Sequence, residues 1–221
     1  MQISIVAFDK FTDIDVFLPW DLLNRARTAG AHDWRVKILG KSPHVTSVAG
    51  LTIPTHGRLD ETSDSAAVIF GSGIGVEDCI KDRDFMDPLD LDENRRLIGS
   101  MCAGAIILAE KGLLKGRRAT TYPTYFKRLA EYDGVQPVEE PFVRNGNVAT
   151  AGGCLAAQLL SEWVMTTLAG PELAEAVLAS ILPVGQGCKA FAGWGDPAAA
   201  KATAAAQGGA RSALAGVTHG R

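Results

Sequence analysis

The stretch "ISIVAFDKFTDIDVFLPWDLLNRARTAG", residues 3–30, places an apolar strand directly before an amphipathic helix. Residues 3–8 are almost all apolar and rich in β-branched side chains, as expected of a parallel strand that is covered on both faces. Between residues 12 and 30, apolar side chains recur at helical spacing, and Gly30 stands where the helix would end. This order of a buried strand and then a helix predicts the first unit of an α/β fold.

The same alternation continues along the chain. Further strands are predicted at "WRVKILG" (34–40) and "AAVIFGSG" (66–73), and another that ends near Met101 and leads into a helix from Ala103. A short hairpin is predicted about Gly50, an Asn-Gly hairpin in "FVRNGNVAT" (142–150), and a late amphipathic helix that ends at Gly170. The pattern predicts a mostly parallel sheet with helices on both faces, a three-layer sandwich.

Composition excludes several classes of partner. The net charge of −3 provides no basic stripe for a nucleic acid, and no run reaches the roughly 18 apolar residues of a membrane span. The N-terminus lacks the pattern of a secretion signal, so a cytoplasmic location is expected. Residues 185–221 are dominated by alanine and glycine and are predicted to be an extension outside the packed domain of residues 1–184.

The chain has four cysteines, Cys79, Cys102, Cys154 and Cys188, and no CxxC pair, which indicates neither a metal site nor a disulfide framework. Cys102 lies between a predicted strand and a predicted helix, where ligands collect in doubly wound sheets. There the helix dipole would lower the pKa of the thiol. The alternative is a small core residue, because free cysteine is among the most buried residue types.

A catalytic thiolate needs an acid or base beside it. None of His32, His44, His56 and His219 stands at a predicted strand end beside a turn that looks functional. Asp13 and Asp15, in "TDID", follow the first strand, although Thr12 and Asp15 also match a capping box. The glycine turn "FGSGIGV" (70–76) lacks the full dinucleotide fingerprint, so no cofactor is expected, and its backbone N–H groups could face a developing negative charge.

Four segments in this order resemble the ThiJ/PfpI superfamily, and most closely its isonitrile (isocyanide) hydratase branch. They are "FTDIDVFLPWDLL", "GSGIGV", "SMCAGAIILAEKGLLKGRRATT" and "VRNGNVATAGG". The resemblance implies a flavodoxin-like, class I glutamine amidotransferase-like domain that assembles as a homodimer. It also implies that Cys102 is the nucleophile, that the Asp15 carboxyl contacts its sulfur, and that Gly73 and Ala103 supply an oxyanion hole.

The chain departs from the family pattern at three places. Tyr122 stands in "TTYP" where many members have histidine, Ala103 replaces the histidine or threonine that other branches have after the cysteine, and Ser72 replaces a glycine. Without a histidine, Cys102 and Asp15 favour cofactor-independent hydration of isonitriles to N-substituted formamides over peptidase or amidase work. Trp20, Ile74 and Tyr122 are expected to line a water-poor substrate pocket.

Two alternatives remain open. One is a glyoxalase or deglycase acting on 2-oxoaldehydes, and the other is a non-enzymatic sensor in which Cys102 is oxidised.

Overall fold

The computed structural model describes residues 1–188, so the predicted extension falls outside the described residues from residue 189 onward. Within this range seven strands form one sheet, in the order β10-β11-β7-β6-β1-β2-β5. Every neighbouring pair is parallel except β10 and β11, which form an antiparallel hairpin. The bounds are β1 Gln2–Val6, β2 Arg35–Gly40, β5 Gly57–Arg58, β6 Ser65–Phe70, β7 Leu97–Met101, β10 Phe142–Asn145 and β11 Val148–Ala151.

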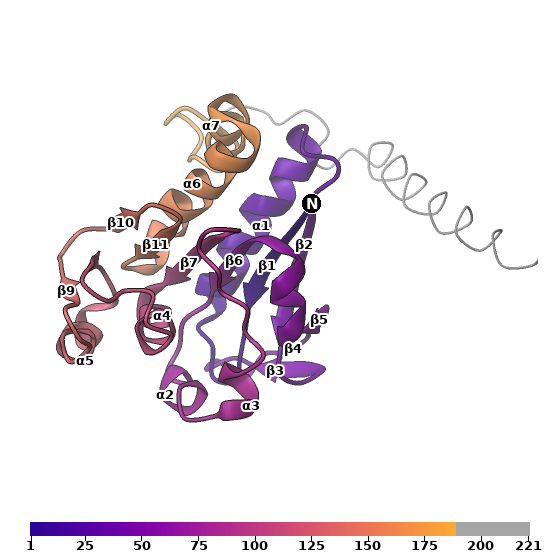
Figure 1. The fold of residues 1–221 in the computed structure, drawn as a ribbon. Coiled ribbons are helices and arrows are strands. Elements are labelled where there is room, and N and C mark those ends of the chain that lie inside the picture. Colours follow the sequence, from indigo (N-terminus) through magenta and orange to yellow (C-terminus); the bar gives the residue numbers. More distant parts are fainter. Residues whose placement is uncertain (189–221) are drawn as a thin grey trace, which may run out of the picture.

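Helices cover both faces of this sheet, as Figure 1 shows. One layer contains α1 (Asp13–Ala29), α6 (Ala157–Ala169) and α7 (Pro171–Ala179), which pack against one another. The other contains α2 (Val76–Cys79), α3 (Arg83–Met86), α4 (Ala105–Glu110) and α5 (Phe126–Ala130). The predicted three-layer α/β sandwich is therefore confirmed.

The short elements complete the chain between the layers. Two small ladders pair β3 (His44–Thr46) with β4 (Thr52–Pro54), and β8 (Arg118–Ala119) with β9 (Gln136–Pro137). The first of them is the hairpin predicted about Gly50. Residues 1–188 also contain the 3₁₀ turns η1 (Leu59–Asp64), η2 (Cys102–Gly104), η3 (Pro123–Tyr125) and η4 (Cys154–Ala156).

The core follows the central strands β1, β6 and β7, whose side chains are almost all buried on both faces. A Cβ atom at Gly99 of β7 would lie 2.8 Å from a methyl carbon of Leu160, so glycine lets α6 approach the sheet closely. None of the described helices is both long and apolar enough to span a bilayer.

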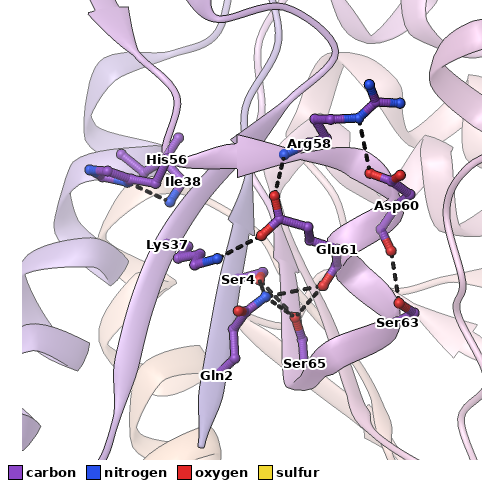
Figure 2. A network of polar contacts seen from close by, with 10 residues as sticks. All are labelled: Gln2, Ser4, Lys37, Ile38, His56, Arg58, Asp60, Glu61, Ser63 and Ser65. Atoms are coloured by element: carbon purple, nitrogen blue, oxygen red, sulfur yellow. Dashed lines mark hydrogen bonds and ion pairs between the residues drawn. The ribbon is translucent and has the colours of Figure 1, made fainter. Parts of the chain in front are cut away.

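A polar network lies at the amino end of β1 and β6 (Figure 2). The buried hydroxyls of Ser4 and Ser65 are 2.7 Å apart, and the Gln2 amide donates to the Glu61 carbonyl oxygen at 3.0 Å. The Glu61 carboxylate forms a 2.6 Å ion pair with Lys37. These contacts attach the 3₁₀ turn η1 to the amino edge of the sheet. Ligands in such folds bind at the opposite edge, at the carboxyl ends of the strands.

The helix predicted from Ala103 differs from the one observed. The chain first makes the 3₁₀ turn η2, and α4 runs only from Ala105 to Glu110. A left-handed residue, Gly112 with φ +76°, follows closely and prevents a longer helix. The element that follows Cys102 is therefore short.

Candidate active site

Cys102 stands at the point where β7 ends and η2 begins. Its φ is +44°, and Lys10 is the other described residue besides glycine with a positive φ. Such a conformation costs about 1–3 kcal/mol and persists only where the surroundings enforce it. Here the buried Thr121 hydroxyl donates to the Cys102 carbonyl oxygen at 2.9 Å. The strained turn places the cysteine at the carboxyl edge of the sheet.

Asp15 lies in the first turn of α1, yet it does not cap that helix. The Thr12 side chain makes no capping hydrogen bond, so the capping-box interpretation is not supported. The Asp15 side chain is 1% exposed, and its Oδ1 atom has no hydrogen-bond partner among the described residues. Instead, a carboxylate oxygen of Asp15 and the sulfurs of Cys102 and Cys154 all lie within 4.8 Å of one another. The predicted pairing of Asp15 with Cys102 is thus present in the geometry.

Burial controls the protonation of this cluster. It raises the pKa of the Asp15 carboxyl, and hydrogen bonds with Cys154, Cys102 and Ser72 oppose that rise only in part. Burial, followed by the charge of Asp15, also raises the pKa of the Cys102 thiol well above its ordinary value. The sequence predicted the opposite direction for Cys102 from the helix dipole. That prediction is corrected, because α4 is only six residues long and the cysteine is buried beside an acid.

Cys154 was not predicted as part of the site. Strand β11 pairs with β7 so that Ala151 is opposite Met101, and the chain that leaves β11 therefore passes beside Cys102. Burial and Asp15 raise the pKa of the Cys154 thiol to about 11. Its position after a buried strand and two glycines resembles the position of Cys102 and is the signal that sequence reasoning passed over. These three side chains also form the described cluster whose donor atoms are close enough to share a metal ion.

A cavity of about 260 Å³ opens above the cluster. The predicted residues Ile74 and Tyr122 line it and are 62% and 46% exposed, which places them at its mouth. Trp20 does not line the cavity and packs against the core instead. Trp20 follows Asp15 by five residues, which rotates it about 140° around the helix axis, away from the face that carries Asp15.

The two predicted oxyanion donors differ in availability. Gly73 lines the cavity at φ +148°, where a Cβ atom would lie 2.1 Å from the Lys10 carbonyl oxygen, and its N–H has no acceptor among residues 1–188. The Ala103 N–H, in contrast, donates to the Ser72 hydroxyl oxygen at 3.1 Å. The serine that replaces the family glycine therefore occupies one of the two donors.

No described histidine lines this cavity. The His56 ring accepts a hydrogen bond from the Ile38 N–H, the His32 ring contacts the Arg27 carbonyl oxygen, and His44 lies in the small β3 ladder. His219 lies outside the described residues. Asp15 contributes a carboxyl group to the lining of this cavity, and Tyr122 and Tyr125 contribute phenol hydroxyls.

Comparisons with known proteins agree with this architecture. Isonitrile hydratase from Pseudomonas putida is 28% identical over 179 residues, which cover 80% of this chain and 76% of that protein. DJ-1 from Schizosaccharomyces pombe superimposes with a TM-score of 0.70 at 17% identity, covering 83% of this chain and 100% of its own. For Drosophila melanogaster DJ-1beta the TM-score is 0.71 at 22% identity, with coverages of 81% and 96%. These two likenesses show the fold. Residues 1–167 match the DJ-1/PfpI family, also called ThiJ/PfpI, and the chain belongs to it.

Proposed function

We propose that this protein hydrates small organic isonitriles to N-substituted formamides, with Cys102 as the nucleophile and Asp15 as the acid and base. The observation that carries the proposal is the buried Asp15 carboxyl beside the Cys102 sulfur in a cavity that no described histidine lines. The relationship to an isonitrile hydratase supports the same chemistry.

The first half of the reaction forms a thioimidate. The Asp15 carboxylate first takes the proton of the Cys102 thiol, because burial keeps that thiol protonated. The resulting thiolate attacks the terminal carbon of the isonitrile, and Asp15 delivers the proton to that carbon. The raised pKa of Asp15 suits this role, because a carboxyl group that keeps its proton to higher pH can act as an acid. The reactive form of the pair therefore carries one proton and one negative charge.

The second half adds water. The Asp15 carboxylate takes a proton from water, whose hydroxide adds to the thioimidate carbon while the nitrogen receives the proton. The tetrahedral intermediate then expels the Cys102 thiolate. The hydroxyl proton of the intermediate passes to Asp15, and the formamide leaves. The Gly73 N–H is the open donor for the oxygen of this intermediate, and Ala103 can join it only after Ser72 rotates away.

The test is to incubate the protein with an alkyl isonitrile and to follow formamide formation. Wild type and a Cys188→Ser control, changed at an exposed cysteine, should turn over. Cys102→Ser and Asp15→Asn should lose at least about 100-fold in rate, as expected when a nucleophile or general acid is removed. A Cys102 thioimidate trapped by mass spectrometry would support the path.

Absence of formamide with wild type contradicts the proposal. Lactate formed from methylglyoxal by the same protein would instead favour the glyoxalase alternative. The family resemblance also leads us to propose a cytoplasmic homodimer, for which light scattering and fractionation are the measurements.

A further inference from the structure

The proposed hydration gives no role to Cys154, although this residue is a second thiol in the same cavity as the nucleophile. The sulfurs of Cys102 and Cys154 lie within 4.8 Å of each other, and both lie within that distance of a carboxylate oxygen of Asp15. Both sulfurs belong to residues that line the same cavity, so a small molecule that reaches one also reaches the other. Two thiols so placed form a pair capable of reacting together.

The backbone around Cys154 leaves room for such a reaction. Cys154 is half-buried, whereas Cys102 is 2% exposed and held in its turn by Thr121. The preceding Gly153 has φ +89°, and there is open space where its Cβ atom would be. A disulfide requires the sulfurs to approach to about 2.05 Å. We expect Cys154, on the less constrained side, to make most of that movement.

We propose that Cys154 is a resolving cysteine, which converts Cys102 oxidised by a hydroperoxide into a Cys102–Cys154 disulfide. In the first step the Cys102 sulfur attacks the hydroperoxide, the O–O bond breaks, and Cys102 sulfenic acid forms with release of an alcohol or water. In the second step the Cys154 sulfur attacks the sulfenic sulfur, the S–O bond breaks, and one water leaves with the Cys154 proton. The two cysteines lose two electrons in total, and the hydroperoxide gains them.

The neighbouring thiol decides which oxidised product accumulates. Conversion of the sulfenic acid to sulfinic acid needs a second hydroperoxide molecule and slows in proportion as the hydroperoxide is diluted. Attack by Cys154 is unimolecular, and its effective concentration does not depend on the oxidant. The disulfide should therefore dominate at low hydroperoxide, and sulfinic acid should appear only in excess.

The other two cysteines are placed where they cannot serve. Cys79 is buried at the end of α2 and lines a separate cavity together with Phe8, Asp9 and Lys10. Cys188 is exposed at the end of the described range and does not line the cavity above Cys102. The pairing is thus expected to be specific to Cys102 and Cys154.

The consequence is a reversible block of the nucleophile. While the disulfide stands, Cys102 has no free sulfur for any electrophile, and a dithiol reductant restores it by exchange. Sulfinic acid at Cys102 would not be reversed in this way. Cys154 would therefore protect the site from permanent loss.

The experiment treats chelator-washed protein with equimolar hydrogen peroxide, blocks free thiols with iodoacetamide, and maps non-reduced peptides by mass spectrometry. Chelation prevents a thiophilic ion from bridging the sulfurs. In wild type we expect a peptide pair joined through Cys102 and Cys154, lighter by two hydrogens and lost after dithiothreitol. Cys79→Ser and Cys188→Ser should give the same product.

In Cys154→Ser and Cys154→Ala we expect no cross-link. With at least two equivalents of hydrogen peroxide we expect Cys102 of these variants to carry two added oxygens, because sulfinic acid consumes two molecules of oxidant. The proposal would be overturned if, in wild type, Cys154 stays reduced while Cys102 either remains unoxidised or carries two added oxygens. So would a cross-link from Cys154 to Cys79 or Cys188. Because the readout is mass and not turnover, it stands or falls independently of isonitrile hydration.

Discussion

Replacement of Asp15 by asparagine should stabilise the fold while it abolishes hydration. The wild-type carboxyl is buried, and its Oδ1 atom has no hydrogen-bond partner within the described part of the chain. An unsatisfied buried polar group costs about 1–3 kcal/mol, and a charged one costs more. Asparagine has nearly the same shape and carries no charge to desolvate. We therefore expect its free energy of unfolding at neutral pH to rise, by up to about 1.4 kcal/mol for each unit by which the native pKa of Asp15 exceeds its ordinary value.

The difference in unfolding free energy between Asp15→Asn and wild type should depend on pH. Burial raises the pKa of Asp15 in the native state above its ordinary value. The native state then binds this proton more tightly than the unfolded chain, so wild type loses stability as pH rises from the unfolded pKa through the native one. Asparagine has no such slope. The advantage of Asp15→Asn should be smallest near pH 4 and should grow until the native carboxyl is fully ionised.

The assay is urea unfolding of both proteins at several pH values between about 4 and 8, with thermal midpoints as a second measure. A gain of 1 kcal/mol should raise the midpoint by about 2–4 °C for a chain of this length. Asp13→Asn is the matched control, since it removes a charge from the same first turn of α1 without entering the cavity. If Asp15→Asn is less stable than wild type at pH 8, or if its difference from wild type is flat with pH, the reasoning is refuted.

Two further substitutions test the surroundings of the nucleophile. Ser72→Gly removes the acceptor that occupies the Ala103 N–H, a bond worth about 0.5–1.5 kcal/mol, and should raise the rate of isonitrile hydration several-fold. Ser72→Ala should behave alike, and unchanged rates in both would exclude Ala103 as an oxyanion donor. Thr121→Val leaves the buried Cys102 carbonyl oxygen without its donor and should lower the free energy of unfolding by about 1–3 kcal/mol. Thr167→Val, in which the lost hydroxyl bond lies within a single helix, should cost less in the same urea titration.

The sequence predicted the individual helices and strands better than it predicted which strands lie side by side in the sheet. Strand β1 and helix α1 follow from local periodicity, and both appear with Gly30 ending the helix. Which strands lie side by side is decided by packing between segments far apart in the chain, and no local pattern encodes it. The pairing of β11 with β7 is such a case, and it alone brings Cys154 to Cys102. A reading of separate segments therefore found the nucleophile and missed its neighbour.

The sequence also could not show how deeply the side chains of Asp15 and Cys102 are buried. The letters "TDID" suit a helix cap and a catalytic acid equally well, and only the side chain's position distinguishes them. In the structure Asp15 faces the cavity instead of the free N–H groups of α1. The direction predicted for the pKa of Cys102 was wrong for the same reason. The helix dipole lowers the pKa of a thiol, but burial raises it, and the sequence did not show the burial.

These features are all unfavourable for folding, which is itself informative. A left-handed cysteine and a buried carboxyl oxygen that has no hydrogen-bond partner among the described residues each lower stability, and both lie at one point of the sheet edge. A site selected only for packing would replace them with apolar residues at no loss. The fully buried strands β7 and β11 lead the chain to Cys102 and Cys154 and fix where both cysteines lie. The cost is concentrated where the chemistry is proposed, so substitutions that relieve it should stabilise the protein and remove its activity together.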